Sequence, residues 1–180
     1  MAKVLTVPNP ILRQKSKPVV VDKKTLALVE TLKKTLTDEK GKIKGVGLAA
    51  IQIGMSKRVF VAYSEKSKKF LTFINPEIVW FSKRQISKKN QKYEGCLSLP
   101  NKWSLLKRSK EVKVKYQTET GQTQIRKFSG MTATIIQHEY DHLEGILFID
   151  RVLEQKGKLY ELKKDEEGKE CLQEITELSN

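Results

Sequence analysis

Histidine and cysteine are scarce in this sequence, which holds only two of each among 180 residues. Two cysteines cannot build the disulfide framework of a small secreted domain, so we expect a reducing compartment and thiols that act singly. No stretch approaches the roughly 18 consecutive apolar residues of a membrane-spanning helix. The first residues lack the apolar core of a signal peptide, and they are not the Ser/Arg-rich start of a transit sequence. We therefore expect a cytoplasmic protein that does not contact membranes.

Acidic residues are also in the minority, with 21 Asp and Glu against 35 Lys and Arg, which gives a net charge of +14. The charge is uneven, because residues 160–180 hold three lysines against seven acidic residues and the other 159 residues therefore carry +18. Such a surface attracts polyanions such as nucleic acid, although a lysine-rich solvated face is the simpler explanation. No nucleic-acid-binding motif is present in the sequence, so the charge predicts no specific DNA partner.

The length fits one domain, on a prior of about 100–200 residues for each domain. Hydrophobic residues make up 38% of the chain, which is enough for a core, and the sequence holds no internal repeat. We therefore expect a single domain over residues 1–180 that ends in a charged tail over residues 151–180.

Two segments before this tail have the apolar spacing of amphipathic helices. Asp22 can cap a first helix that extends to about Lys40. Ser129 or Thr132 can cap a second helix that ends at Gly145. Within the tail, three apolar residues recur as a packing stripe that favours a further helix: Leu172, Ile175 and Leu178.

Short apolar runs rich in β-branched residues predict strands between and after these helices. They cover residues 58–63, 70–74, 77–81, 112–116, 123–128 and 146–149. The runs at 112–116 and 123–128 alternate apolar and polar residues on either side of a Glu-Thr-Gly-Gln turn, so they predict a β-hairpin. Residues 82–92 form a basic loop without periodicity.

The pattern His-Glu-x-x-His over residues 138–142 carries the clearest chemistry. Residues four apart on a helix lie about 5–6 Å apart at Cβ, so His138 and His142 can converge on one metal ion. Glu139 projects roughly 100° round the same turn, which places its carboxylate beside the metal, where a general base for water belongs. The chain has no other histidine, so a third protein ligand must be Cys, Asp or Glu.

Cys96, in the stretch Glu94 to Pro100, is the candidate that we favour as the third ligand. A lone cysteine is more often a small buried hydrophobic residue, but two histidines that need a partner change that expectation. Cys171 is the competitor. It lies beside the apolar stripe of the charged tail, so we interpret it as structural or semi-exposed.

Residues 45–54 are unusually small, with three glycines, two alanines and a single polar side chain, that of Gln52. Small residues let another backbone or a ligand come close. A tight turn around a hydrogen-bonded Gln52 would have the same composition, so this stretch alone does not decide between a structural and a functional role.

Together, these three stretches resemble the peptide deformylase family. Residues 45–52 resemble its G-Φ-G-x-A-A-x-Q motif, in which Φ is apolar. Residues 94–98 resemble its E-G-C-Φ-S motif, and residues 137–142 resemble its Q-H-E-x-D-H motif. The order and spacing of the motifs also agree with the family, and the resemblance covers about residues 3–150.

The family implies an α+β fold in which a central metal-binding helix is surrounded by antiparallel β-sheets. With the helices predicted above, the chain would add an N-terminal helix and a C-terminal helical tail. The family also implies a metal-dependent hydrolase of protein biosynthesis, which removes the N-formyl group from the N-terminal formyl-methionine of newly made polypeptides and releases formate. The expected partners are those nascent polypeptides and, through the basic body of the protein, the ribosome surface.

Carried onto this sequence, the resemblance implies that Cys96, His138 and His142 bind one divalent metal ion, with water in the fourth position. Iron (Fe²⁺) is the ion that the family implies in the cell. Two imidazoles and a thiolate also suit Zn²⁺, Ni²⁺ or Co²⁺, which could occupy the site in purified protein.

The resemblance also implies roles for five residues around the metal. Glu139 would be the general base and acid. Gln52 and the backbone N–H of Leu97 would hold the oxyanion that forms when the formyl carbonyl is attacked. Val46 and Gly47 would line the path of the substrate backbone.

The sequence departs from the family pattern in two places. Lys102 and Trp103 stand in the loop where family members often place an arginine that can meet the peptide. The tail is acidic and interrupted by Gly168, whereas some bacterial members dock on the ribosome through a basic C-terminal helix. We therefore do not carry that docking mode over to this chain.

Two other functions compete with this interpretation. A zinc metallopeptidase shares the His-Glu-x-x-His pattern, and its third ligand would come from a carboxylate after the motif: Asp150, Glu154 or Glu161. A basic ribosome- or RNA-binding module with a structural metal would need a fourth protein ligand, for which Cys171 is the remaining soft donor. Cys96, with Gln52 upstream, favours the deformylase over the peptidase.

Overall fold

The structure is a computed structural model that describes residues 1–37, 40–87, 89, 91–164 and 168–175. Its helices are α1 (Lys23–Thr35), α2 (Gly130–Leu143) and α3 (Phe148–Glu154), with 3₁₀ turns η1 (Pro10–Arg13) and η2 (Ala50–Ile53). Its strands are β1 (Gly47–Ala49), β2 (Val59–Ser64), β3 (Lys69–Phe81), β4 (Glu94–Cys96), β5 (Leu99–Ser104), β6 (Glu111–Gln117), β7 (Thr123–Ser129), β8 (Leu159–Lys164) and β9 (Glu170–Ile175). None of the helices in these ranges is long and apolar enough to span a membrane.

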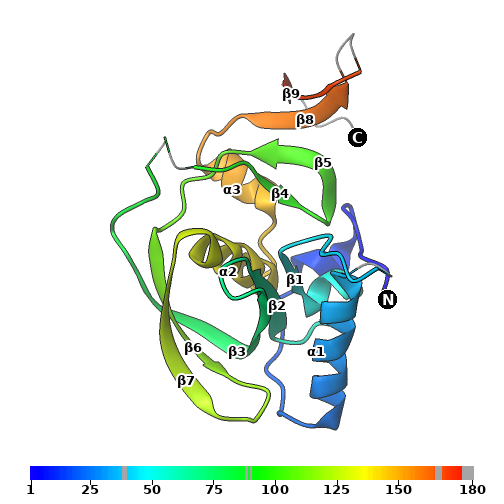
Figure 1. Cartoon of the computed structure of the whole chain (residues 1–180), viewed down its shortest axis with the longest axis vertical. Coiled ribbons are helices and arrows are strands. Elements are labelled where there is room, and N and C mark those ends of the chain that lie inside the picture. The colour runs from blue at the N-terminus through cyan, green and yellow to red at the C-terminus, as the bar shows by residue number, and fades with distance from the viewer. Residues whose placement is uncertain (38–39, 88, 90, 165–167, 176–180) are drawn as a thin grey trace.

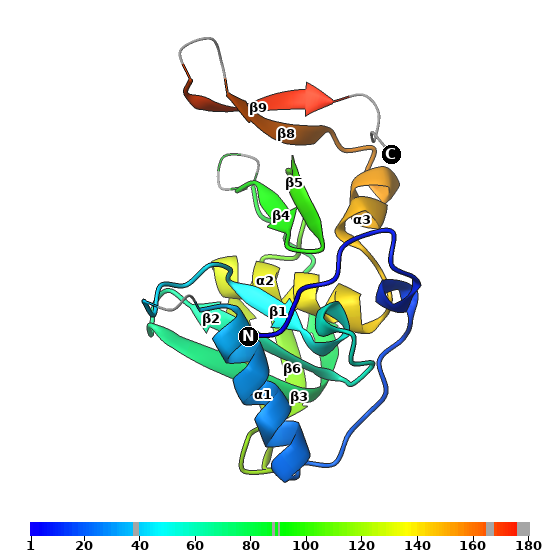
Figure 2. The same cartoon turned by 90° about the vertical axis from the view of Figure 1, so that its right-hand side faces the viewer.

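The described strands form two antiparallel sheets on either side of α2 (Figures 1 and 2). The larger sheet has the strand order β1-β2-β3-β6-β7, and the smaller one has the order β4-β5-β8-β9. Helix α2 lies across the larger sheet, and the smaller sheet lies beyond the helix with α3 beside it. The predicted α+β fold with a central helix between antiparallel sheets is therefore confirmed.

Strand β2 is buried because helices cover both faces of the larger sheet. Phe60 stacks on Phe73 with ring centroids 4.6 Å apart, and both pack with Ile136 of α2 on one face. Val61 points to the opposite face, as alternation along a strand requires, and packs with Leu32 of α1. This packing fixes α2, and with it both predicted histidines, against a rigid sheet.

Helix α1 begins where the sequence predicts and ends earlier. Asp22 caps it, since the carboxylate accepts a hydrogen bond from the Thr25 N–H at 2.7 Å. The predicted end near Lys40 is wrong because the chain folds back after Leu36, whose carbonyl accepts a hydrogen bond from the Lys44 N–H at 2.7 Å. That return brings residues 45–47 toward α2.

The predicted hairpin around the Glu-Thr-Gly-Gln turn is confirmed as β6 and β7. The strands predicted at 70–74 and 77–81 are instead one strand, β3. The prediction of two strands was wrong because Pro76, which has no N–H to donate, does not end the strand. The pairing of β3 with β6 continues past it through a register shift between Ile74 and Glu77.

The expected C-terminal helical tail is wrong beyond α3. Residues 146–149, predicted as a strand, lead into α3 because Asp150 accepts a hydrogen bond from the Leu147 N–H at 2.7 Å and caps the helix. After α3 the chain forms the hairpin β8–β9, and β8 pairs with the open edge of β5. Leu172 and Ile175 are thus strand residues, and Leu178 lies outside the described residues. The strand conformation is stabilised by this pairing, because the backbone of β8 makes ladder hydrogen bonds with the edge of β5 that a helix could not make.

Candidate active site

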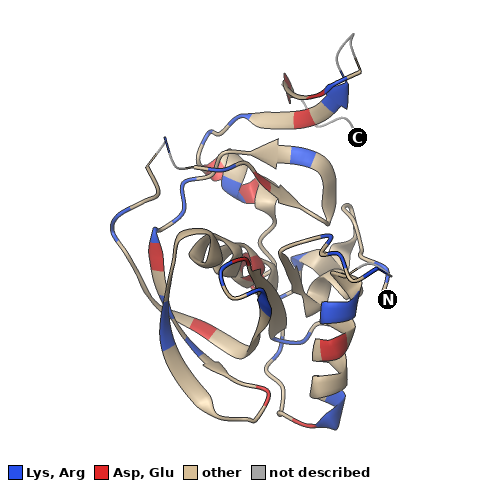
Figure 3. Ribbon diagram, viewed as in Figure 1, with Lys and Arg blue, Asp and Glu red and all other residues tan. Residues whose placement is uncertain are grey.

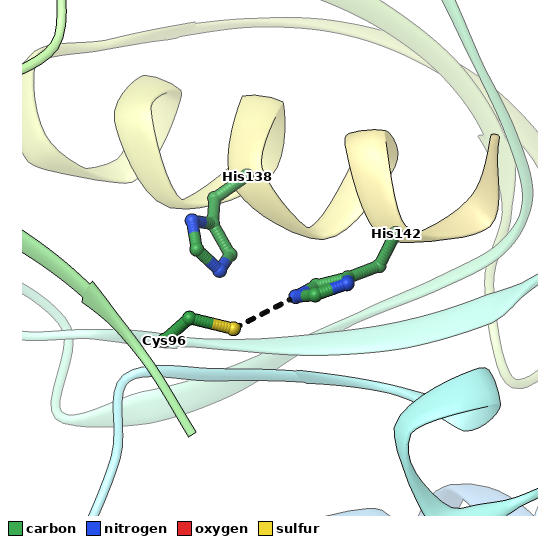
Figure 4. Close-up of side chains that lie close together, drawn as sticks. All are labelled: Cys96, His138 and His142. Carbon is green, nitrogen blue, oxygen red and sulfur yellow. Dashed lines mark hydrogen bonds between the residues drawn. The ribbon is translucent and has the colours of Figure 1, made fainter. Parts of the chain in front are cut away.

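Helix α2 and strand β4 bring the three predicted metal ligands together (Figure 4). The rings of His138 and His142 lie one helical turn apart, with centroids 4.9 Å apart. Cys96, the last residue of β4, points toward both rings, and its Sγ lies 3.2 Å from Nε2 of His142. One donor atom from each residue lies within 4.8 Å of the other two.

A bulge in the smaller sheet sets the direction of Cys96. The register between β4 and β5 shifts after Gly95, since Gly95 pairs with Trp103, whereas Cys96 pairs with Leu99. The indole of Trp103 covers Gly95 so closely that a Cβ at residue 95 would lie 2.8 Å from the ring. The glycine before Cys96 is therefore required by the close approach of Trp103.

Glu94, the first residue of β4, orients the His138 ring. Its Oε1 lies 2.8 Å from Nδ1 of His138, which leaves Nε2 of that ring for a metal. Arg108 donates to both oxygens of Glu94 at 2.6 and 3.1 Å and to Asp141 at 2.6 Å. Arg151 donates to Asp141 as well, at 2.6 and 3.1 Å. This buried network holds α2 and β4 in fixed relation.

Sequence reasoning missed the contribution of Arg108, which has no local signature among its basic neighbours. The side chain is 6% exposed, a burial that two carboxylate partners make tolerable. Burial opposes the ionisation of Glu94, but Arg108 and His138 outweigh it and lower the pKa of Glu94 to about 2. The position of Glu94 two residues before Cys96 is the one signal in the sequence that could have suggested this partnership.

The three donors fit a divalent metal ion. Burial alone would raise the pKa of the Cys96 thiol, but His142 and His138 outweigh burial and lower that pKa well below its usual range. The thiolate, which is the form that binds metals, is therefore favoured. A tetrahedral site with bonds of about 2.0–2.3 Å separates its donors by about 3.5 Å. The distance of 3.2 Å between Cys96 and His142 is close to this separation.

The amide of Gln52 is held beside these donors. Its Oε1 accepts a hydrogen bond from the Ala49 N–H at 2.8 Å, so Nε2 points the other way. Nε2 donates to Oγ of Ser98 at 3.2 Å and lies 3.8 Å from Sγ of Cys96. Gln52 is 1% exposed, and its donor group therefore has a fixed direction next to the metal donors.

The N-terminal arm joins the Gln52 turn to the loop after Cys96. The N–H of Leu5 donates to the carbonyl of Gln52 at 2.8 Å, and the N–H of Val7 donates to the carbonyl of Ser98 at 3.0 Å. Two segments that are 46 residues apart in the sequence are thus held together by alternate residues of one extended arm.

Glu139 lies beside the donor cluster and is 4% exposed. Its carboxylate approaches Gly47 of β1, and its Oε2 has no hydrogen-bond partner in the described part of the chain. Burial raises the pKa of Glu139 to about 7, although the two histidines oppose the shift. A carboxyl group with a pKa near 7 can accept and release a proton at neutral pH.

A pocket of about 1060 Å³ adjoins these residues. Val46 and Gly47 line one side of it, and β1 is the edge strand of the larger sheet, so the free edge of that sheet borders the pocket. Four large apolar side chains of the lining are between 40 and 44% exposed: Val46, Tyr93, Leu97 and Met131. Such exposure of apolar surface inside a pocket is typical of a ligand-binding groove.

The residues that would support the competing functions lie elsewhere. The three carboxylates considered for a peptidase each pair with a basic side chain: Asp150 with Arg13, Glu154 with Arg151 and Glu161 with Lys102. Cys171 is exposed on β9. Among the described residues, none of these four belongs to the donor cluster. The peptidase interpretation therefore lacks its third ligand, and the structural-metal interpretation lacks its fourth.

Comparison with known proteins identifies the same family over most of the chain. Residues 1–158 match the family model described as polypeptide deformylase. The peptide deformylase of Pseudothermotoga lettingae is 43% identical over 153 residues, which cover 83% of this chain and 82% of that protein. The peptide deformylase of Pelagibacter ubique is 42% identical over 161 residues, which cover 87% and 88%.

Solved structures agree with this result. The crystal structure of peptide deformylase from Thermotoga maritima gives a TM-score of 0.74 at 36% identity and covers 84% of this chain and 97% of that one. A Met-Ala-Ser-bound class I type b peptide deformylase from Acinetobacter baumannii gives 0.73 at 32% identity, covering 83% and 97%. The chain therefore belongs to the polypeptide deformylase family, metal-dependent hydrolases that remove the formyl group from the N-terminal methionine of nascent polypeptides.

Proposed function

We propose that this chain carries out deformylation with one divalent metal ion held by Cys96, His138 and His142, and with Glu139 as the group that moves protons. The observation that carries the proposal is the convergence of three donor atoms within 4.8 Å, next to a buried carboxylate. A closed structural site would have a fourth protein donor. The described ranges offer none there, so the proposed site has room for substrate.

We propose Fe²⁺ as the ion in the cell, on the strength of the family resemblance, with Zn²⁺, Ni²⁺ or Co²⁺ able to occupy the same donors. When bound, such an ion lowers the pKa of water toward about 7 and polarises the formyl carbonyl. Metal analysis of protein purified without oxygen tests this assignment. Iron in near-equal amount to protein is the expected result, and zinc as the main ion would contradict it.

Glu139 performs the proton transfers in this proposal. Its pKa of about 7 suits it to take the proton that water loses as the oxygen attacks the formyl carbon. The same proton then passes to the nitrogen of the departing amine, so the carboxylate is restored when formate leaves. Glu139 lies outside the donor cluster, so its carboxylate is available for both transfers.

Two groups are proposed to stabilise the negative charge on the formyl oxygen, Nε2 of Gln52 and the backbone N–H of Leu97. The hydrogen bonds of Gln52 to Ala49 and Ser98 support its role, because they hold the donor in place before substrate arrives. Losing one such donor costs about 2.7–4 kcal/mol of transition-state stabilisation. Gln52→Ala should therefore lower kcat by about 10²–10³-fold while the protein keeps its metal.

Val46 and Gly47 are proposed to guide the substrate backbone. An extended peptide can add to the free edge of β1 as a further strand, with main-chain hydrogen bonds to the edge. The exposed apolar side chains of the pocket suit the methionine side chain. The related deformylase of Acinetobacter baumannii is described with Met-Ala-Ser bound, which is a peptide of this kind.

We propose that the protein works in the cytoplasm as a single domain of residues 1–180, in which β8 and β9 extend the sheet that carries Cys96. Its basic body, and not its acidic tail, is the proposed contact with the ribosome surface. Removal of residues 166–180 should therefore leave ribosome binding intact in co-sedimentation at low salt. Loss of binding by a truncated protein that still folds would contradict this proposal.

Formate release from formyl-Met-Ala-Ser tests the function as a whole. Protein purified without oxygen and assayed for metal should release formate and free Met-Ala-Ser in equal amounts. Cleavage of peptide bonds in an unformylated peptide would instead indicate a peptidase.

A further inference from the structure

The pocket is lined by more positive than negative charge. Five basic side chains line it: Lys44, Arg84, Lys92, Lys102 and Lys110. Among the described residues, the acidic side chains of the lining are Glu94, which is 9% exposed, and Glu139, which is buried. Glu94 is also neutralised by its ion pair with Arg108. Among the described lining residues, a peptide that extends from the site would therefore meet exposed cations and no exposed carboxylate.

Four of the basic side chains are exposed and have no ion-pair partner in the part of the chain that the structure describes: Lys44, Arg84, Lys92 and Lys110. We call these four the cationic rim. Lys102 differs, because Glu161 of β8 binds its ammonium group. Basic residues recur along the connection between β3 and β4, at the left of Figure 3, which supplies Arg84 and Lys92.

Arg84 and Lys110 are held next to the N-terminus of α2. The N–H of Lys110 donates to the carbonyl of Arg84 at 2.9 Å, and the N–H of Gly130 donates to the carbonyl of Lys110 at 3.1 Å. Gly130, Met131 and Thr134 of this helix also line the pocket, and its first turn holds no acidic residue. The positive end of the helix dipole therefore adds to the charge of the two side chains.

We propose that the cationic rim makes this deformylase favour formyl-Met polypeptides that carry Asp or Glu in the residues after the second. The inference rests on the proposed function, because it takes the pocket as the place where the nascent chain lies. With the formyl group at the metal donors, an extended chain advances about 3.3 Å for each further residue and passes the rim. Its carboxylates would meet unpaired cations there, whereas lysines would be repelled.

The size of the effect follows from the exposure of the rim. Exposed charge pairs are individually weak, and salt screens them over a distance of about 8–10 Å. One carboxylate is therefore expected to raise kcat/KM by about two- to fivefold at low salt, and two carboxylates by about tenfold. The gain should appear mainly in KM, because charges remote from the formyl group bind substrate and transition state alike.

Three C-terminally amidated peptides test the inference: formyl-Met-Ala-Asp-Asp-Ser, formyl-Met-Ala-Asn-Asn-Ser and formyl-Met-Ala-Lys-Lys-Ser. The Asp and Asn peptides have the same shape and differ in charge, and the Lys peptide reverses the sign of the charge. We expect kcat/KM to fall in that order by about tenfold at each step near 0.05 M salt, and by about twofold or less near 0.5 M. In the double variant Arg84→Gln/Lys110→Gln, the ratio between the Asp and Asn peptides should fall to about threefold or less. Lys66→Gln, at an exposed position outside the pocket lining, is the matched control and should keep the wild-type ratio.

Equal kcat/KM for the Asp and Asn peptides in the wild-type protein would overturn the inference, and so would a wild-type ratio in the double variant. In the wild-type protein alone, a ratio of kcat/KM between the Asp and Asn peptides that stays the same at low and high salt would also overturn the inference. If the Asn peptide also released no formate, the proposed function would fall together with the inference, so the two failures are distinguishable.

Discussion

The carboxylate of Glu139 occupies the space in which a side chain at residue 47 would begin. A Cβ built on Gly47 would lie 2.3 Å from Oε1 and 2.8 Å from Cδ of Glu139, closer than real Cβ contacts allow. The glycine of β1 is therefore required by an acidic residue of α2, 92 positions later in the sequence. This contact explains why the small-residue stretch and the His-Glu-x-x-His pattern belong to one site.

Gly47→Ala should displace the Glu139 carboxylate without touching the metal donors. A misplacement of about 1 Å at a reacting group can cost 10²-fold in rate, so we expect kcat to fall by about that factor or more. Metal content should not change, because Cys96 and both histidines remain. The matched control is Gly157→Ala, whose new Cβ would meet its neighbours at 3.4 Å, and this variant should keep wild-type kcat. Wild-type kcat in Gly47→Ala would show that the carboxylate position is not critical.

Glu139→Gln separates proton transfer from metal binding. The amide keeps the shape of the side chain but cannot take a proton, and general acid–base catalysis is worth about 10²–10⁴-fold. We expect kcat to fall by at least that range, with metal content and peptide affinity nearly unchanged. Loss of metal from this variant would make Glu139 a ligand or a support for one, and a wild-type turnover rate would contradict its proposed role.

Cys96→Ala and Cys171→Ala form a matched pair, since each removes one of the two thiols. Cys96→Ala should lose most of the bound metal and nearly all activity, because Cys96 supplies one of the three donors of the cluster. Cys171→Ala should keep both, because Cys171 is exposed on β9. Metal analysis after anaerobic purification measures the difference. Equal metal content in Cys96→Ala and the wild-type protein would remove Cys96 from the site.

Glu94→Gln tests whether the partner of His138 tunes the metal site. The amide keeps the shape but loses the charge that holds Nδ1 of His138 at 2.8 Å. Loss of such a partner typically costs 10–100-fold in metal affinity, so competition with a chelator should show a weakening of about that size. Glu30→Gln, on the exposed face of α1, is the control and should keep the wild-type affinity. Equal affinity in Glu94→Gln would mean that the network serves stability alone.

Local sequence patterns predicted those parts of the molecule that depend on local geometry. His138 and His142 lie on one helix, so their spacing alone places both rings on the same side of it. The hairpin of β6 and β7 follows likewise from alternation around a turn. Cys96 was harder to assign, because it lies on β4 of the smaller sheet and not on the helix that holds the two histidines. It was inferred from the scarcity of other donors and from the family resemblance, and the structure brings it to the same point.

The rest of the molecule depends on contacts between distant segments. Arg108 joins Glu94 to Asp141 across 14 and 33 residues, and nothing adjacent to it in the sequence marks it for this role. The structure of the tail likewise depends on contacts with a distant segment. Its apolar residues are compatible with a helix, but β8 pairs with the edge of β5 and β9 pairs with β8, so tertiary pairing overrides the local pattern.

The N-terminal arm is made first, but its contacts in the site need segments that are made later. Leu5 and Val7 leave the ribosome well before their partners, the carbonyls of Gln52 and Ser98, which follow 47 and 91 residues later. Until both carbonyls have emerged, at least one of these two N–H groups lacks its final acceptor. During synthesis the arm therefore cannot join the two segments until Ser98 has been made, so an early part of the chain completes its contacts late.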